Sequence, residues 1–385
     1  MNWDDIIVDA AATDTGMRRA NNQDSHTIVR ASKVETWRSR GHMFMVADGM
    51  GAHAVGELAS KLACDNIPHN YNKTKAGPPS EAITKAYKQV GGIIHGKAAA
   101  NRDFQGMGTT CSTLVLMPEG ALIAHVGDSR VYRARQGRID QLSFDHSLAW
   151  ELVRRNHLSA EQATKAVPRN VITRSLGPDP NVEVDIEGPH PVEVGDVFLL
   201  CSDGLSGPVQ DPELGAFAAN FRPEDACRYL LHLANLRGGH DNITVVIVRI
   251  GPWVEPDSQA DLPASPAGAQ ANAEKKGWIK GLSGLLAAKK KVELVEEHLY
   301  RSCECPISAE LVDRLTELVT RAQQTAVEQT WPVDWPNLAN LRRDATTSRA
   351  AGQLRRALMA IGEAIDVLGT GGRIHKKSVG QANAS

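Results

Sequence analysis

Short apolar runs separated by glycine-rich polar turns characterise the first 250 residues of the chain. The clearest runs are 42–47, 110–117, 121–126, 197–201 and 243–250. Their length predicts β-strands, and the close spacing of the runs between 110 and 142 indicates antiparallel hairpins. Apolar residues at helical spacing predict helices at 54–71, 80–94 and 223–236. Strands and helices of this kind bury their apolar faces by forming layers, so we expect a sandwich of two sheets with helices outside.

The pattern changes after the last of these strands. Residues 253–277 are rich in Pro, Ala and Ser, which is typical of a linker. Beyond it the apolar spacing is helical only, and it predicts a small bundle or hairpin over 278–372, followed by a disordered tail at 373–385. The lysine-rich stretch 275–291 also carries tryptophan and leucine, which suits an interfacial membrane helix or a packed bundle helix. We favour the packed helix and expect no membrane contact.

Composition narrows the class of protein. Of the 385 residues, 42% are hydrophobic and 23% are charged, which excludes general disorder. A net charge of −2 provides no overall attraction to nucleic acid or to an anionic membrane. The six cysteines are scattered and the chain begins without the apolar core of a signal peptide. We therefore expect a cytoplasmic protein that does not bind nucleic acid.

Four carboxylates occur in one recurring context, at a strand end beside glycine. They are Asp48, Asp128, Asp203 and Asp241. Each alone is an ordinary turn residue. Their repetition predicts that strand ends converge at one sheet edge and gather the acids around two or more divalent cations. Oxygen ligands without a Cys/His cluster suit Mg²⁺ or Mn²⁺ better than zinc.

Eight short motifs occur in a characteristic order. They are 14–16, 19–24, 46–53, 107–110, 127–130, 145–147, 202–204 and 241–242. In this order they resemble the PPM (type 2C) family of metal-dependent protein serine/threonine phosphatases, the bacterial members above all, over residues 5–250. The resemblance implies an α+β fold, a four-layer α-β-β-α sandwich over 1–252. It places the metal site at one end of the sheets, with 145–177 as a variable flap beside it.

The resemblance also implies roles for the acids at the matching positions. Asp48 would bridge two catalytic metals, with the Gly49 carbonyl on one of them. Asp203 and Asp241 would complete the coordination of the other. Asp128, together with Asp203, would hold a third metal.

Residues near the first strands receive further roles by the same resemblance. Arg19 would bind the substrate phosphate, and Asp24 would orient metal-bound water without binding the metal. Gln23 replaces a metal-contacting glutamate of many members; it remains a candidate ligand but brings no charge, so we expect weaker metal affinity. Met50 replaces the histidine proposed as general acid in eukaryotic members. The source of the leaving-group proton therefore stays open.

The function implied by the resemblance is hydrolysis of phosphoserine and phosphothreonine in proteins. The attacking group would be a hydroxide bridging two Mg²⁺ or Mn²⁺ ions. The partners would be phosphorylated proteins and a cognate Ser/Thr kinase whose action the enzyme reverses. The alternative is an impaired pseudophosphatase that acts as a binding or regulatory module. For the C-terminal helices, partner binding, self-association and regulation all remain open.

Overall fold

The computed structural model describes residues 6–52, 55–74, 77–155, 171–253 and 300–382, together with residues 157 and 162. Both the predicted linker at 253–277 and the lysine-rich stretch at 275–291 lie, apart from residue 253, outside the described residues. Within the described ranges, no helix combines the length and the apolar character needed to cross a bilayer.

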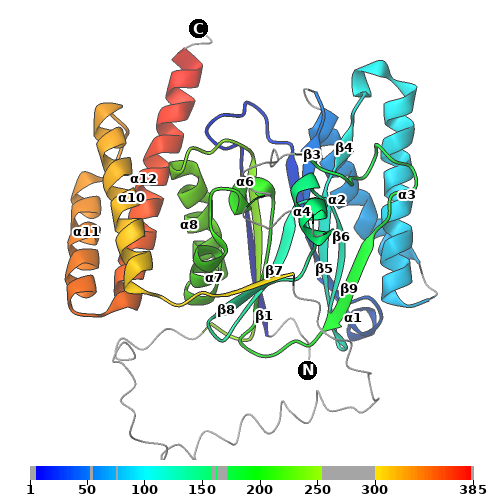
Figure 1. Ribbon diagram of the computed structural model, residues 1–385, viewed down its shortest axis with the longest axis horizontal. Helices are drawn as coiled ribbons and strands as arrows, with labels where there is room; N and C mark the ends of the chain where they lie inside the picture. Colours follow the sequence, from blue (N-terminus) through cyan, green and yellow to red (C-terminus); the bar gives the residue numbers. More distant parts are fainter. Residues whose placement is uncertain are drawn as a thin grey trace, which may run out of the picture.

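Two antiparallel sheets form the centre of the molecule (Figure 1). The first, sheet A, runs in the order β1 (Ile7–Asp14), β11 (Ile243–Ile250), β10 (Val197–Cys201), β7 (Arg130–Arg135), β8 (Arg138–Gln141) and β12 (Arg301–Glu304). The second, sheet B, runs in the order β2 (Asp24–Val29), β3 (His42–Met50), β5 (Cys111–Met117), β6 (Gly120–Val126) and β9 (Asp185–His190), with β4 (Gly108–Thr109) on β3. The predicted sandwich of two antiparallel sheets is thus confirmed.

The two sheets pack face to face through alternate residues of their strands. Phe44 and Val46 point inward from β3, and Phe198 and Leu200 point inward from β10. Successive side chains of a strand point to opposite faces, so every second residue reaches this core. The other face of each strand is buried too, because helices cover it. This explains why the strands appear in the sequence as continuous apolar runs.

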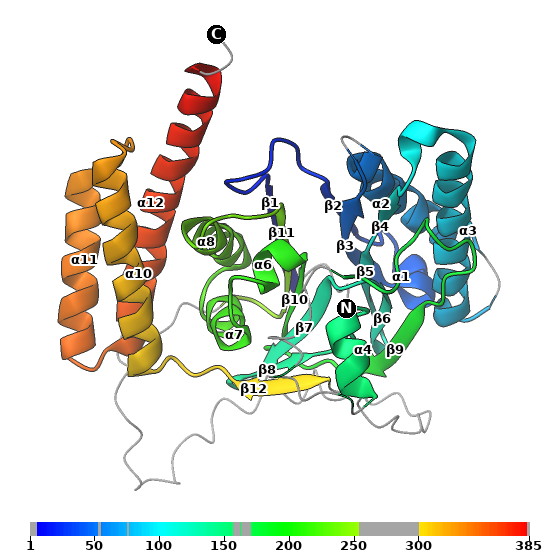
Figure 2. The ribbon, with the colours of Figure 1, turned by 45° about the horizontal axis from the view of Figure 1, so that its top comes forward.

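Helices cover the outer face of each sheet (Figures 1 and 2). Sheet B is covered by α2 (Val55–Lys73) and α3 (Pro79–Ala100), and sheet A by α7 (Asp211–Asn220) and α8 (Pro223–Leu236). The short elements are α1 (Val34–Arg40), η2 (Arg102–Phe104), α4 (Leu148–Arg154) and α6 (Asp203–Ser206). These layers reproduce the four-layer arrangement.

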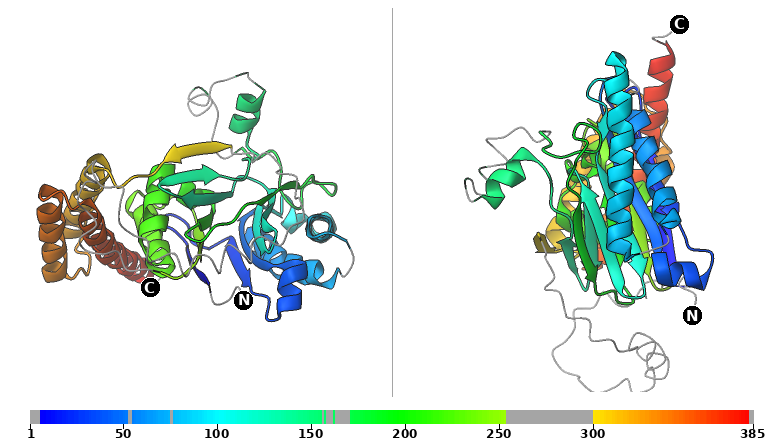
Figure 3. Two further views of the ribbon diagram at one scale, coloured as in Figure 1. Left: turned by 90° about the horizontal axis from the view of Figure 1, so that it is seen from below. Right: turned by 90° about the vertical axis from the view of Figure 1, so that its right-hand side faces the viewer.

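The C-terminal segment adds one further layer outside α8 (Figures 1 and 3). It contains α10 (Ala309–Glu328), α11 (Trp335–Ala350) and α12 (Leu354–Ala382). Apolar side chains of α10 and α12, such as Leu315, Leu358 and Ile365, are buried in the same core cluster as Leu230 of α8. The predicted bundle is therefore present, but it shares its core with the sandwich.

Two predictions for this segment are wrong. The pattern beyond the linker was interpreted as helical only, yet β12 is a strand that pairs with the edge strand β8. Main-chain hydrogen bonding to an existing edge determines its structure, and an apolar pattern is not required. The predicted end at 372 is also wrong, because α12 continues through 373–382 instead of a disordered tail. Within this stretch Arg373 forms an ion pair with Asp14, and Lys376 donates to the carbonyls of Gly16 and Arg19.

Candidate active site

Asp48 stands at the end of β3, opposite Asp24 of β2 in the strand pairing. Thr110 fixes the backbone on both sides of Asp48. The Asp48 N–H donates to Thr110 Oγ1 at 2.9 Å, and the Thr110 N–H donates to the Asp48 carbonyl at 2.8 Å. Both carboxyl groups are therefore presented at the same end of sheet B by regular strand geometry.

Gly49 fills a place where no side chain fits. A β carbon there would lie 2.0 Å from the Gly56 carbonyl oxygen of α2 and 2.6 Å from the Gln23 carbonyl oxygen. The close approach of β2 and α2 thus requires glycine next to Asp48. Gln23 lies at the same turn, and its Nε2 donates to the Gly51 carbonyl at 3.3 Å.

Sheet A brings the remaining acids to this end. Asp203 begins α6, with one residue between it and the end of β10, and its carboxyl group is close enough to interact electrostatically with that of Asp48. Asp241 lies in the turn before β11 and accepts a hydrogen bond of 2.8 Å from Arg19 Nη2. Asp128, in the turn between β6 and β7, is close enough to interact electrostatically with Asp48 and Asp203. All of the acids predicted for the metal site therefore converge.

Burial and mutual repulsion make four of the carboxyl groups, those of Asp24, Asp48, Asp128 and Asp203, reluctant to ionise. Burial is the larger cause in each case, and the neighbouring carboxylates add to it. Together they raise the pKa of Asp24 to about 7 and that of Asp128 to about 8. They also raise the pKa of Asp203 and bring that of Asp48 well above its usual range. Such a cluster needs positive charge if it is to be ionised near neutral pH.

The donor set fits hard divalent cations. Asp24, Asp128 and Asp203 each have a buried Oδ1 that lacks a hydrogen-bond partner among the described residues. Among the described residues, no group of three or more His, Cys, Asp or Glu side chains is placed to hold one metal ion by itself. An open set of carboxylate oxygens suits Mg²⁺ or Mn²⁺, because such ions keep several waters and take few ligands from the protein.

Two residues with structural tasks at the site received no role from the sequence. Asn242 Nδ2 donates to the carbonyls of Thr15 (3.1 Å) and Asn21 (2.9 Å), and its Oδ1 accepts from the Gln23 N–H (2.8 Å). Ser202 Oγ donates to Asp24 Oδ2 at 2.7 Å. Both lie inside recognised motifs, next to Asp241 and Asp203, but only the packed loop reveals what they hold.

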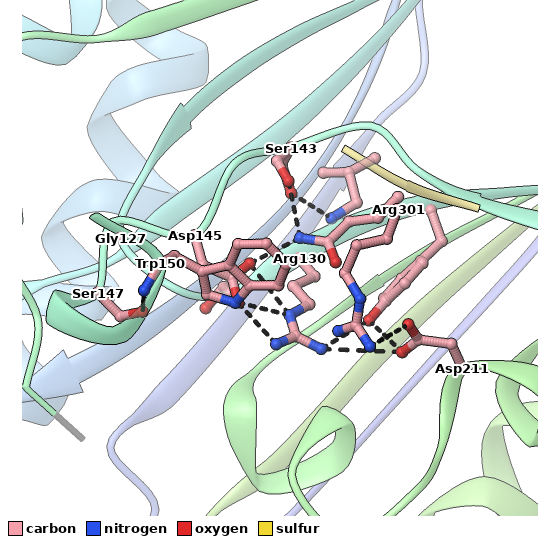
Figure 4. A network of polar contacts seen from close by, with 12 residues as sticks. Gly127, Arg130, Ser143, Asp145, Ser147, Trp150, Asp211 and Arg301 are labelled. Atoms are coloured by element: carbon pink, nitrogen blue, oxygen red, sulfur yellow. Dashed lines mark hydrogen bonds and ion pairs between the residues drawn. The ribbon is translucent and has the colours of Figure 1, made fainter. Parts of the chain in front are cut away.

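A cavity of about 660 Å³ opens beside Asp128 and Asp203. Trp150 of α4 lines it from the predicted flap, and Arg301 of β12 lines it from the C-terminal segment (Figure 4). The Arg301 guanidinium carbon lies 5.5 Å from the centre of the Trp150 ring. Its Nη2 lies 3.2 Å from Asp211 Oδ2. The C-terminal segment therefore contributes to the wall of a cavity adjoining the acids.

Arg130, whose side chain is 15% exposed, also lines this cavity. Its Nη2 donates to Asp145 Oδ2 at 2.6 Å, and its Nη1 donates to the Tyr132 hydroxyl at 3.0 Å (Figure 4). Asp145 belongs to one of the sequence motifs. The pairing shows that Asp145 is committed to an ion pair with Arg130, which fixes the start of the flap relative to sheet A.

Fold and site together define a metal-binding sandwich, and comparison with known proteins shows its family. The family model described as Protein phosphatase 2C matches residues 17–233. The chain belongs to this family, which confirms the resemblance found in the sequence. The C-terminal segment at 300–382 lies beyond the matched residues.

Individual relatives agree with this assignment. A putative protein phosphatase 2C-type protein of Streptococcus pyogenes is 33% identical over 244 residues, which are 61% of this chain and 94% of that protein. The solved serine/threonine phosphatase of S. agalactiae is 32% identical with a TM-score of 0.58, over 63% of this chain and 99% of that one. The catalytic domain of the serine/threonine protein phosphatase PstP, solved with two manganese ions, is 30% identical with a TM-score of 0.54, over 64% and 99%.

Proposed function

We propose that the chain is a protein phosphatase that removes phosphate from phosphoserine and phosphothreonine with the help of divalent cations. The observation that carries the proposal is the set of buried Oδ1 atoms of Asp24, Asp128 and Asp203 that lack a hydrogen-bond partner among the described residues. They lie at the end of the sheets where Asp48 and Arg19 also lie. A binding module would gain nothing from placing several acids together out of water, since each raises the cost of ionising the others.

Asp48, Asp203, Asp241 and the Gly49 carbonyl are the proposed ligands of two Mg²⁺ or Mn²⁺ ions. Asp128, together with Asp203, is the proposed binding site of a third. When bound, such ions supply positive charge at phosphorus and lower the pKa of attacking water. Gln23 adjoins this group from the turn at Gly51, where a neutral amide replaces a charged ligand.

Arg19 and Asp24 have complementary tasks in this proposal. The Arg19 side chain is 52% exposed and reaches the edge from outside, so that its planar fork of donors can take two phosphate oxygens. Asp24 lies inside, 6% exposed, and is anchored by Ser202. It orients water from behind the ligands and leaves the outer side to the substrate.

The proposed partners are phosphorylated proteins and a cognate Ser/Thr kinase whose products the enzyme would reset. We propose residues 1–252 as the catalytic unit and 300–382 as an added layer with one strand in sheet A. All six cysteines are free, which fits the reducing cytoplasm that we propose as its setting.

Phosphate release from a phosphothreonine peptide tests the proposal. The full chain should release phosphate with Mn²⁺ present and stop when a chelator is added, because the carboxylates alone offer no positive charge to the substrate. An absence of turnover across a full Mn²⁺ titration would instead favour the pseudophosphatase. The matched control is Asp48→Asn, which preserves side-chain shape but removes the proposed bridging charge.

A further inference from the structure

The end of α12 contacts the loop that carries Arg19 (Figures 1 and 2). Lys376 Nζ donates to the Gly16 carbonyl at 2.6 Å and to the Arg19 carbonyl at 3.0 Å. One helical turn earlier, Arg373 Nε lies 3.1 Å from Asp14 Oδ2, where the loop begins. We propose that Lys376 and Arg373 are positioning residues, by which the C-terminal layer holds the phosphate-binding loop against the metal edge.

The opposite side of the loop rests on the turn before β11. The N–H groups of Met17 and Arg18 donate to the Gly239 carbonyl at 2.7 and 3.1 Å. Gly16 has φ +71°, and a β carbon there would lie 2.1 Å from the Asp241 carbonyl oxygen. The loop is therefore a single layer of backbone between the turn that carries Asp241 and helix α12. Contacts on both sides therefore restrain its position.

Lysine suits this task by its chemistry. Its ammonium group carries three donors, so a single side chain can satisfy two carbonyl groups that no strand or helix pairs. The carbonyls of Gly16 and Arg19 bracket the intervening residues, so the two bonds restrain both ends of the segment. Arg373 adds charge at Asp14, whose Oδ1 also accepts from the Gly16 N–H at 2.9 Å.

Helix α12 is packed closely against α8, so it can support the loop. Glycines one heptad apart let it approach α8 closely: β carbons at Gly362 and Gly369 would lie 2.8 Å from the Tyr229 ring and 2.3 Å from His232 Nδ1. Arg228 Nε of α8 also lies 2.9 Å from Asp366 Oδ1 of α12. Because α8 packs on β1 and β11, a displacement of α12 relative to the metal edge would disturb the core of the sandwich.

The inference rests on the proposed function, since it assigns Arg19 to phosphate. If the loop were loosened, the proposed metal ligands would stay in place. Part of the free energy of phosphate binding would then be used to order Arg19, so phosphate would bind more weakly. Lys376→Met should therefore raise KM for a phosphothreonine peptide about tenfold, the size of one charge-assisted hydrogen bond. The inhibition constant of inorganic phosphate should weaken by a similar factor, with kcat changed much less.

Hydrogen–deuterium exchange tests the same contact without metal or turnover. In metal-free Lys376→Met protein, the amides of Met17 and Arg18 should exchange about tenfold faster than in the wild type, because their bonds to Gly239 open more often. Lys377→Met is the control, since Lys377 is the next residue of α12 and is exposed. Lys376→Arg retains donors and should restore most of the protection and the KM.

The outcomes separate the two proposals. Faster exchange and a raised KM in Lys376→Met, both absent from Lys377→Met, support the positioning role. Exchange and KM equal to the wild type in Lys376→Met and in the double variant with Arg373→Met would overturn it. If the wild type releases no phosphate at all, the proposed function fails, whereas the exchange measurement still decides whether α12 holds the loop.

Discussion

The two outer faces of the sandwich differ in how they are covered. Over sheet B, α3 meets solvent: Ile93 is 43% exposed, and a β carbon at Gly92 would have no neighbour within 4 Å. Over sheet A, α8 is covered in turn by α12, and nearly all of its residues after the first turn are buried. A helix buried on all sides needs a partner on each of them. The C-terminal layer is therefore part of the folded core on that face.

This difference extends to the site. On the sheet B side, α2 touches the metal edge through the backbone of Gly56, which is packed against Gly49. On the sheet A side, the added layer reaches the edge through side chains, Lys376 at the Arg19 loop and Arg301 at the adjoining cavity. Backbone packing therefore positions the proposed metal ligands, and we expect the side-chain contacts to influence what approaches them.

The largest expected effect comes from the edge shared by both faces. Asp203→Asn should lower kcat by on the order of 10³, because the amide keeps the shape of the side chain but loses the charge opposite Asp48. The same change at Asp313, an exposed residue of α10 paired with Arg349, should leave kcat unchanged. Steady-state kinetics with a phosphopeptide measures both. Equal kcat values for the two variants would remove Asp203 from the proposed metal site.

Deletion of the C-terminal layer tests how far the two faces differ. A chain ending at residue 253 would expose the apolar face of α8 that now packs on α12. We expect its melting temperature to fall by more than about 10 °C and the protein to bind a hydrophobic dye. A truncated chain that melts like the full chain would show that the layer is a removable module.

A pair of glycine substitutions compares the two faces directly. In Gly369→Ala the new methyl group would lie 2.3 Å from His232 Nδ1, and such overpacking should lower the free energy of unfolding by about 1–3 kcal/mol. In Gly92→Ala the methyl group enters open space, and the helix should gain up to about 1 kcal/mol. Thermal unfolding of both variants measures the contrast. If both substitutions changed the free energy of unfolding in the same direction, the proposed difference between the two outer faces would be contradicted.

The smallest expected effect is the contribution of Glu213, which lies beneath the C-terminal layer, to the pH dependence of the free energy of unfolding. Burial alone would raise the pKa of Glu213, but hydrogen bonds and charge from Arg237, with help from Arg314 of α10, lower it. A depressed pKa in the folded state contributes stability above the unfolded value of about 4.5 and loses it as the pH falls further. Denaturant unfolding at several pH values should give Glu213→Gln a shallower loss below that pH. Parallel curves for wild type and variant would show that the pair makes no net contribution.

Much of the sandwich could be predicted from the sequence, because its strands and turns are marked by residues that are neighbours in the chain. Asp48, Asp128 and Asp203 each sit beside glycine at the end of an apolar run, and the sheets bring such ends together. The order of the motifs then indicated four layers. The tasks of Asn242 and Ser202 could not be predicted in this way, because each depends on a loop or strand far away in the chain.

The C-terminal layer was harder to predict for physical reasons. Residues 301–304 read Arg-Ser-Cys-Glu, which shows no apolar alternation, and only the free edge of β8 makes them a strand. The run of glycines near 369–372 is typical of a helix end. In the structure these glycines lie inside α12 because they face bulky neighbours, among them Trp331 and His232. Tertiary packing therefore overrides the local stop signal.

Calorimetric titration of Mn²⁺ into chelator-treated full-length protein tests the central claim most directly, because it measures the proposed metal site without assuming a substrate. The account predicts binding of about two ions per chain or more. Asp48→Asn should lose most of this binding while its melting temperature without metal stays close to that of the wild type. Unchanged Mn²⁺ binding in Asp48→Asn, or no binding by the wild type, would contradict the account.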